Sequence, residues 1–248
     1  MKRPDPKTLA IRALRETGEA TDWYQIKNNA GTPEVLIYGE IGVPGVDPEQ
    51  FVRDLSKIKS KRLTVRIHSV GGDAFDGMAI YNGLKRHPAH VTTIIDGIAA
   101  SAASFIAQAG DERGIHATAE IMIHPAYGLL IGDADEFRHY ADTLDKTSDA
   151  VASIYADRAG GTVAEWRGVM KSERWYSSRE ALEAGLVDRI VEDDQPPADS
   201  GLVRVQTEAS ARLAEVRAQV THYMVIGQQA APDEHDELRA QIAGYLNL

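Results

Sequence analysis

The sequence predicts an α/β fold in which a largely parallel sheet is covered by helices. Apolar runs of strand length alternate with segments of helical spacing, and the links between them are short. This alternation is typical of stacked βαβ units. Apolar residues make up 43% of the 248 residues, which is enough to bury the core of one large domain with appendages.

The first half of the predicted domain consists of three strand–helix pairs. The strands are expected at 35–41, 63–68 and 91–96, and the helices at about 47–60, 78–84 and 101–108. Asp47 and Pro48 form a good helix start, because an N-cap aspartate is followed by proline at the first helical position. Gly71 and Gly72 break the second strand and separate it from its helix.

The second half continues the pattern with one long helix. A strand at 119–124 is followed by helical spacing over 134–158, which Gly160 and Gly161 end. The remaining elements are expected in the order helix, strand, helix, strand: about 162–171, around Trp175, 178–184 and 187–191.

The domain organisation is predicted from shifts in composition. Residues 1–30 are polar and weakly periodic, which predicts an N-terminal arm or an early hairpin, and residues 31–192 form the main domain. The run of aspartate and proline after 192 predicts a linker over 193–204. Residues 205–248 carry two amphipathic patterns and are expected to form a helical C-terminal extension.

Composition and charge exclude several function classes. The 37 acidic residues against 27 basic ones give a net charge of -10, which argues against a general nucleic-acid binder. The absence of cysteine excludes disulfides, thiol catalysis and cysteine-bound zinc. No apolar stretch predicts a signal peptide or a membrane span, and no histidine spacing predicts a metal site. We therefore expect a cytoplasmic protein that uses no metal or cofactor and binds no membrane.

Ser101 is the first candidate for chemistry. It follows a strand and begins a helix within the small-residue segment 97–104. A hydroxyl there lies at the positive end of the helix dipole, and the amide of the next residue points the same way. Taken alone, the serine is more simply explained as a helix cap.

Two further motifs follow neighbouring predicted strands. His124 ends an apolar strand, where an imidazole can act as the general base for a serine hydroxyl. Gly71 and Gly72 allow another backbone to approach closely and leave an amide free to point outward. In a parallel sheet, ligands bind outside the carboxyl ends of the strands, so these motifs and Ser101 are predicted to meet there.

In this combination the chain closely resembles the ClpP family of serine peptidases over about residues 34–192. The separation of Gly72 and Ser101, 29 positions, fits that family. The stretches that carry the resemblance are Ser69–Gly72, Gly97–Ser101, Met122–Pro125, Glu173–Ala181 and Gly185–Asp188.

The resemblance implies a role for each matching residue. Ser101 is the expected nucleophile, His124 the base and Glu173 the third member, where the family usually has aspartate. The amides of Gly72 and Ala102 are expected to form the oxyanion hole. An extended substrate is expected to add as a strand between Val70–Gly71 and a strand formed by Pro125, Ala126, Tyr127 and the residues up to Leu129. The 134–158 helix resembles the family's handle, which packs two homo-oligomeric rings together.

The sequence also departs from housekeeping ClpP. Val70 replaces a proline, and Ala102 and Ala103 replace methionine and glycine. Residues 1–30 do not resemble the axial-loop segment that meets an unfoldase. These departures resemble the ClpP-related head maturation proteases of tailed bacteriophages, which implies a capsid or scaffold protein as substrate, in the host cytoplasm or the procapsid.

Three alternatives remain open at this stage. A host-type ClpP paralogue would work under an ATPase partner. A crotonase-like acyl-CoA enzyme has a related fold but needs no serine–histidine pair. An inactive structural ring would retain the fold without turnover.

Overall fold

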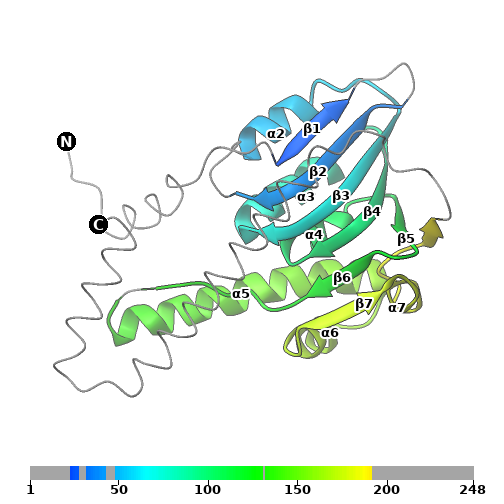
Figure 1. The fold of residues 1–248 in the computed structure, drawn as a ribbon. Coiled ribbons are helices and arrows are strands. Elements are labelled where there is room, and N and C mark those ends of the chain that lie inside the picture. Colours follow the sequence, from blue (N-terminus) through cyan, green and yellow to red (C-terminus); the bar gives the residue numbers. More distant parts are fainter. Residues whose placement is uncertain (1–22, 28–31, 43–47, 131, 192–248) are drawn as a thin grey trace, which may run out of the picture. The chain divides into compact units, whose positions relative to one another are not determined.

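The computed structural model describes residues 23–27, 32–42, 48–130 and 132–191, which form eight strands and six helices (Figure 1). The predicted linker at 193–204, the extension at 205–248 and most of the N-terminal arm lie outside the described residues. The strands are β1 (Tyr24–Lys27), β2 (Glu34–Ile41), β3 (Arg62–Gly72), β4 (His90–Ala100), β5 (Glu112–His116), β6 (Glu120–Ile123), β7 (Arg174–Ser177) and β8 (Arg189–Val191).

The strands form one mixed sheet with a parallel centre. Its order is β1-β2-β3-β4-β5-β8, and β6 pairs with both β4 and β7. The pairs among β2, β3, β4, β5 and β8 are parallel, as is β4 with β6, while β1 and β7 are antiparallel additions. The expected parallel sheet is therefore present, and the two antiparallel strands make it mixed.

The helices α2 (Pro48–Leu55), α3 (Ala74–Lys85) and α4 (Ala102–Ala107) follow β2, β3 and β4 in turn and pack on the sheet. Figure 1 shows α2 and α3 on the same side of the strands. Alternate strand residues such as Val65 and Ile67 face this layer and join one buried cluster with Phe51 and Ile80. Burial of these side chains supplies most of the driving force for the layered arrangement.

The helix α5 (Ala134–Ala159) occupies the predicted long segment. It begins at a capping box in which Asp133 accepts from the Glu136 amide and Glu136 reaches back to the Asp133 amide. Its second half is the buried part, with Val151, Ala152 and Tyr155 in the same core cluster as the sheet. Two short helices follow, α6 (Val163–Met170) and α7 (Ser178–Glu183).

A buried arginine ties β8 to the rest of the sheet. Arg113 on β5 is 5% exposed, and its NH2 group lies 2.5 Å from a carboxylate oxygen of Asp188. Its NH1 group donates to Gln108 Oε1 and to the Gly185 carbonyl, at 2.8 and 2.9 Å. Partial burial alone would raise the pKa of Asp188, but the hydrogen bonds and charge of Arg113 outweigh it and hold the pKa below its usual range.

This pairing predicts a specific acid sensitivity. Because the folded-state pKa of Asp188 is lowered, its contribution to stability is present above the unfolded pKa, about 3.9, and is lost as the pH falls through the folded value. We expect Asp188→Asn to lower the urea midpoint at pH 7 and to make it less dependent on pH between 5 and 3. Asp142→Asn, an exposed carboxylate on α5, is the control and should follow the wild-type pH dependence; identical curves for all three proteins would contradict the assignment.

Candidate active site

Ser101 lies at a sharp turn between β4 and α4. Its backbone has φ 51° and ψ -121°, a left-handed conformation that a residue with a side chain adopts only under strain. The serine is the N-cap of α4 but makes no side-chain cap hydrogen bond, so the simple capping explanation does not hold in this structure. A strained strand-to-helix turn of this kind leaves a serine hydroxyl exposed above the sheet.

The turn is anchored to the neighbouring strand. β4 and β6 run parallel with Ala100 opposite Met122, and the Ser101 amide donates to the Met122 carbonyl at 2.9 Å. Since His124 comes two residues after Met122, this pairing carries the nucleophile candidate and the base candidate to the same edge of the sheet.

The structure brings Ser101 and His124 into direct contact. His124 Nε2 lies 2.7 Å from Ser101 Oγ, which is hydrogen-bonding distance. Both residues are half-buried, so the pair is reachable from solvent but partly shielded from it. With Nε2 unprotonated, the imidazole can accept the serine proton, as nucleophilic catalysis by serine requires.

The two glycines at the end of β3 lie against this turn. A methyl group placed on Gly71 would come within 2.7 Å of the Ala102 nitrogen and of Ser101 Cβ. Gly71 is itself buried and donates its amide to Ser69 Oγ at 3.1 Å, whereas Gly72 is exposed. The structure thus places Gly71 against the Ser101–Ala102 turn, and Gly72 is the next residue along the chain. Glycine is required at 71 because its φ is 95° and two of its three nearest neighbours are backbone atoms.

Glu173 lies near His124 in the backbone, but its carboxylate does not reach the imidazole. β7 pairs antiparallel with β6, with Arg174 opposite Ile123, so Glu173 is the next position on the side of His124. Its side chain is exposed and makes no hydrogen bond or ion pair within the described part of the chain. Arg174, which could have paired with it, binds Glu180 at 2.8 Å instead. Glu173 also has a φ of 48°, the second strained non-glycine residue among those described.

Asp96 is the carboxylate closest in sequence before Ser101, and it is occupied elsewhere. Its oxygens accept from Arg66 Nε at 2.9 Å and from Arg66 NH2 at 2.5 Å, and Tyr38 donates its hydroxyl to the same carboxylate. Arg66 alternates along β3 with the core residues Val65 and Ile67, so its side chain meets half-buried Asp96 of β4 on the sheet face opposite the helical layer. Asp96 is therefore engaged by groups other than His124.

The expected substrate-binding segment after His124 is not a strand in this structure. Pro125, Ala126 and Tyr127 form no regular secondary structure, although the family resemblance implies a strand there. Proline cannot donate to a ladder, and the Ala126 amide donates at 2.9 Å to Ser148 Oγ on α5 rather than to another strand. Tyr127 is 66% exposed, with its ring 5.2 Å from the His124 ring, so an aromatic surface borders the base. Val70, on the other side of the site, is half-buried.

Two residues that the sequence did not single out lie behind the turn. Ser104, which the sequence places in a small-residue patch, is fully buried, and its hydroxyl binds the Ser101 carbonyl. Tyr155, predicted as part of an apolar helix face, is 1% exposed and meets Ser104 through its hydroxyl at 2.7 Å. The signal that could have found them is a polar atom at a buried position, which needs a partner.

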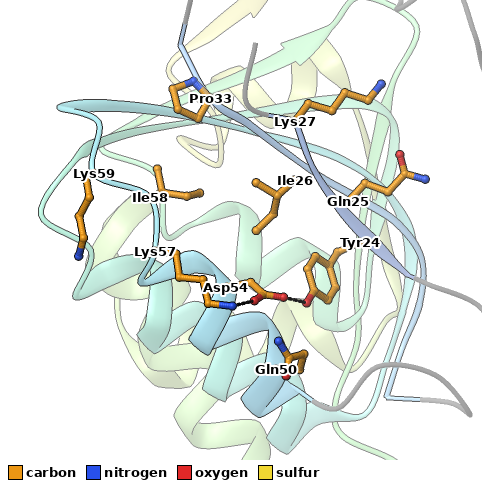
Figure 2. Close-up of a pocket in the computed structure, with 10 residues that line it drawn as sticks. All are labelled: Tyr24, Gln25, Ile26, Lys27, Pro33, Gln50, Asp54, Lys57, Ile58 and Lys59. Atoms are coloured by element: carbon orange, nitrogen blue, oxygen red, sulfur yellow. Dashed lines mark hydrogen bonds and ion pairs between the residues drawn. The ribbon is translucent and has the colours of Figure 1, made fainter. Parts of the chain in front are cut away.

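A separate pocket lies at the other end of the sheet. β1 and the C-terminal end of α2 line it, with Ile26 and Ile58 on its wall and Lys27, Lys57 and Lys59 at its rim (Figure 2). Asp54 sits between Lys57 and the Tyr24 hydroxyl, and hydrogen bonds from Gln50, Lys57 and Tyr24 hold its pKa well below the usual range. None of the expected site residues lines this pocket.

The described residues contain no group of three or more histidine, cysteine, aspartate or glutamate side chains arranged to hold a metal ion. None of the helices within the same residues is long and apolar enough to cross a membrane.

The fold and this site together define a class of enzyme. A strained serine in contact with a histidine at the carboxyl ends of parallel strands is the arrangement of a serine hydrolase. Residues 49–194 match the family model for Clp protease. The chain belongs to this family, that of the ClpP-type serine peptidases.

Curated relatives agree with the family. The chain is 35% identical over 137 residues to an ATP-dependent Clp protease proteolytic subunit of Chlorella vulgaris, which covers 54% of this chain and 68% of that protein. It is 31% identical over 190 residues to a protein of the same description from Ostreococcus tauri, covering 72% and 92%. Subunit 1 from Streptomyces coelicolor is 32% identical over 139 residues, covering 55% and 64%.

Proposed function

We propose that this protein is a serine endopeptidase in which Ser101 is the nucleophile and His124 the general base. The 2.7 Å contact between Ser101 Oγ and His124 Nε2, at a strained turn, is the observation that carries the proposal. The crotonase-like and inactive-ring alternatives require no such pair, and membership of the Clp protease family further weighs against them.

The proposed reaction proceeds through an acyl-enzyme. His124 Nε2 takes the proton of Ser101 Oγ as that oxygen bonds to the carbonyl carbon of the substrate peptide. The carbonyl oxygen becomes an oxyanion that accepts hydrogen bonds from the Gly72 and Ala102 amides. His124 then gives the proton to the leaving nitrogen, the carbon–nitrogen bond breaks, and water releases the acyl group by the same steps in reverse order.

Glu173 is proposed as the residue that orients His124 once substrate is bound. The pairing of Ile123 with Arg174 brings the backbone of Glu173 toward His124, which supports this role, and its longer side chain can reach farther than aspartate. Catalytic hydrogen bonds often tighten only in the substrate complex.

This role predicts a moderate kinetic loss. Because the carboxylate lies outside hydrogen-bonding distance of His124 here, we expect Glu173→Gln to lower kcat by about 10-fold, well below the roughly 10⁴-fold loss known for a preformed triad aspartate. Glu183→Gln, a carboxylate on α7, serves as the control. Steady-state kinetics over pH 5–9 measures both, and an unchanged Glu173→Gln profile would remove Glu173 from the mechanism.

The substrate class is proposed from the departures from housekeeping ClpP. Val70, Ala102 and Ala103 resemble the phage head maturation proteases, for which the substrate is a capsid or scaffold protein. The second candidate is a host-type Clp subunit that works with an ATPase, and the similarity to ATP-dependent Clp protease proteolytic subunits favours it. We propose the head maturation role and treat the ATPase-dependent role as its direct competitor.

One experiment separates the two roles. The full chain is incubated with a folded capsid–scaffold assembly from a tailed phage, and separately with the same proteins after chemical unfolding, in both cases without ATP or an unfoldase. Cleavage of the folded assembly at defined sites, seen by intact mass, is expected of a maturation protease. Cleavage of unfolded chains alone would support the ATPase-dependent role and overturn the proposed one.

A further inference from the structure

A buried chain of hydroxyl groups leads from α5 to the nucleophile turn. Ser104 lies one helical turn after Ser101 on α4 and is fully buried. Its Oγ is 2.5 Å from the Ser101 carbonyl oxygen and 2.7 Å from the hydroxyl of Tyr155. Tyr155 is itself buried on α5, so neither hydroxyl has access to bulk water.

The direction of the hydrogen bonds along this chain follows from the chemistry of the groups. A carbonyl oxygen can only accept, so Ser104 must give its single hydroxyl hydrogen to Ser101. Ser104 Oγ can then only accept from Tyr155, whose hydroxyl is the donor. Burial raises the pKa of Tyr155, which keeps this phenol protonated and able to donate at neutral pH.

The last acceptor of these hydrogen bonds, the Ser101 carbonyl, belongs to the same peptide group as the proposed oxyanion donor, the Ala102 amide. The Ser101 carbonyl and the Ala102 amide are two ends of one planar peptide group, so the orientation of one determines the direction of the other. The carbonyl also accepts from the Ser104 amide at 3.0 Å. Hydrogen bonds accepted by a carbonyl polarise its peptide and strengthen the N–H as a donor, by about 10–30% per bond.

This peptide needs such support because it adjoins a strained residue. The φ and ψ of Ser101 lie in a sparsely populated region, which persists only when the surroundings determine it. The Ser101 amide donates to the Met122 carbonyl, and the hydroxyls of Tyr155 and Ser104 together hold the Ser101 carbonyl. We propose that Ser104 and Tyr155 are positioning residues that orient the Ser101–Ala102 peptide so that the Ala102 amide points at the oxyanion.

The proposal rests on the proposed function, since it assumes that Ala102 is an oxyanion donor. Neither Ser104 nor Tyr155 touches the reacting atoms. The Tyr155 ring is placed independently of its hydroxyl, by packing 5.4 Å from the Trp166 ring, and Trp166 donates to the Gly160 carbonyl at 2.7 Å. Tyr155→Phe therefore removes the hydroxyl while keeping the packing.

The test measures how fast a fluorophosphonate probe labels Ser101 in the full chain. We compare Tyr155→Phe, Ser104→Ala and the double variant, with Tyr81→Phe as the control because Tyr81 is a partly buried tyrosine on α3 that does not bind Ser104. Loss of a whole oxyanion donor costs about 10²–10³-fold, so a misdirected one is expected to cost about 10-fold in Ser104→Ala and about 3-fold in Tyr155→Phe. Because the two hydroxyls act in series, the double variant should label no more slowly than Ser104→Ala.

The final extent of labelling separates positioning from folding. A partly unfolded variant labels to a lower extent, whereas a misdirected amide slows labelling without reducing its extent. With p-nitrophenyl acetate the same variants should lose kcat and keep KM. Three results would overturn the proposal: wild-type labelling rates in both single variants, a loss of labelling extent without a loss of rate, or additive losses of rate in the double variant. The proposed function stands in each case if the probe labels Ser101 of the wild-type protein. A wild-type protein that the probe does not label at Ser101 overturns both.

Discussion

Replacing Ser101 by alanine is expected to lower peptide hydrolysis by at least about 10³-fold, because the substituted residue has no oxygen to form the acyl-enzyme. Binding and the oxyanion donors remain, which leaves a small residual rate. The fold should be retained, since serine and alanine experience the same strain at φ 51°. Hydrolysis of casein by the full chain and the urea midpoint measure activity and stability in parallel.

A second substitution at the same position is the control for strain. Ser101→Gly also lacks the nucleophile, but glycine adopts positive φ without steric cost. It should be as inactive as Ser101→Ala and more stable, by roughly 1 kcal/mol. Undiminished hydrolysis by either variant, or labelling of the buried Ser104 by a fluorophosphonate, would contradict the assignment of Ser101.

Substituting Gly72 by alanine is expected to reduce stability and activity together. The new methyl group would lie 2.0 Å from the Ile41 carbonyl oxygen and 2.7 Å from the Ile41 nitrogen, and φ at this position is 148°. Backbone atoms of a paired strand cannot move aside as a side chain can, so the end of β3 must separate from β2. We expect a loss of about 3 kcal/mol in the free energy of unfolding, at the upper end of ordinary point mutations.

Activity should fall in the protein that remains folded, because the displaced strand end carries the proposed Gly72 oxyanion donor. The loss of one such donor costs about 10²–10³-fold in kcat. Gly168→Ala is the matched control: it lies exposed within α6, and a methyl group there meets nothing within 4 Å. Alanine should stabilise that helix by about 1 kcal/mol and leave labelling of Ser101 unchanged. A Gly72→Ala protein with the wild-type free energy of unfolding and the wild-type kcat would contradict the close approach of β2 and β3.

The elements that local pattern predicts well are those with long apolar runs. The strands expected at 35–41 and 63–68 are observed as Glu34–Ile41 and Arg62–Gly72, and the helix expected at 134–158 ends at Ala159. The expected break at Gly71 and Gly72 was wrong, because both glycines pair with β2 and extend β3. β5 was missed because only Ile115 among its side chains is apolar, and its Arg113 is charged yet buried. Such a strand exists because β4 and β8 pair with it on either side, and pairing partners are not visible in a local pattern.

The site residues also fall into those that the sequence predicted and those that it did not. Ser101, His124 and Gly72 were predicted from their positions after successive strands, and the parallel register does bring these segments to one edge of the sheet. The prediction of a strand at Pro125–Leu129 was wrong, since none of the strands in the described residues pairs with this segment and Ser148 on α5 accepts from the Ala126 amide. The family resemblance suggested Glu173, but the direction of its side chain depends on a left-handed turn that no spacing rule predicts.

By itself, the sequence determined the alternation of strands and helices, the residue types that stand at the strand ends, and membership of the Clp protease family. These depend on the order and chemistry of neighbouring residues, which the chain carries directly. Only the tertiary structure decided that Ser101 Oγ meets His124 Nε2, that the Ser101 backbone is strained, and that Tyr155 and Ser104 stand behind it. Those properties arise from packing between α4, α5 and the sheet, where residues 51 positions apart share one hydrogen bond.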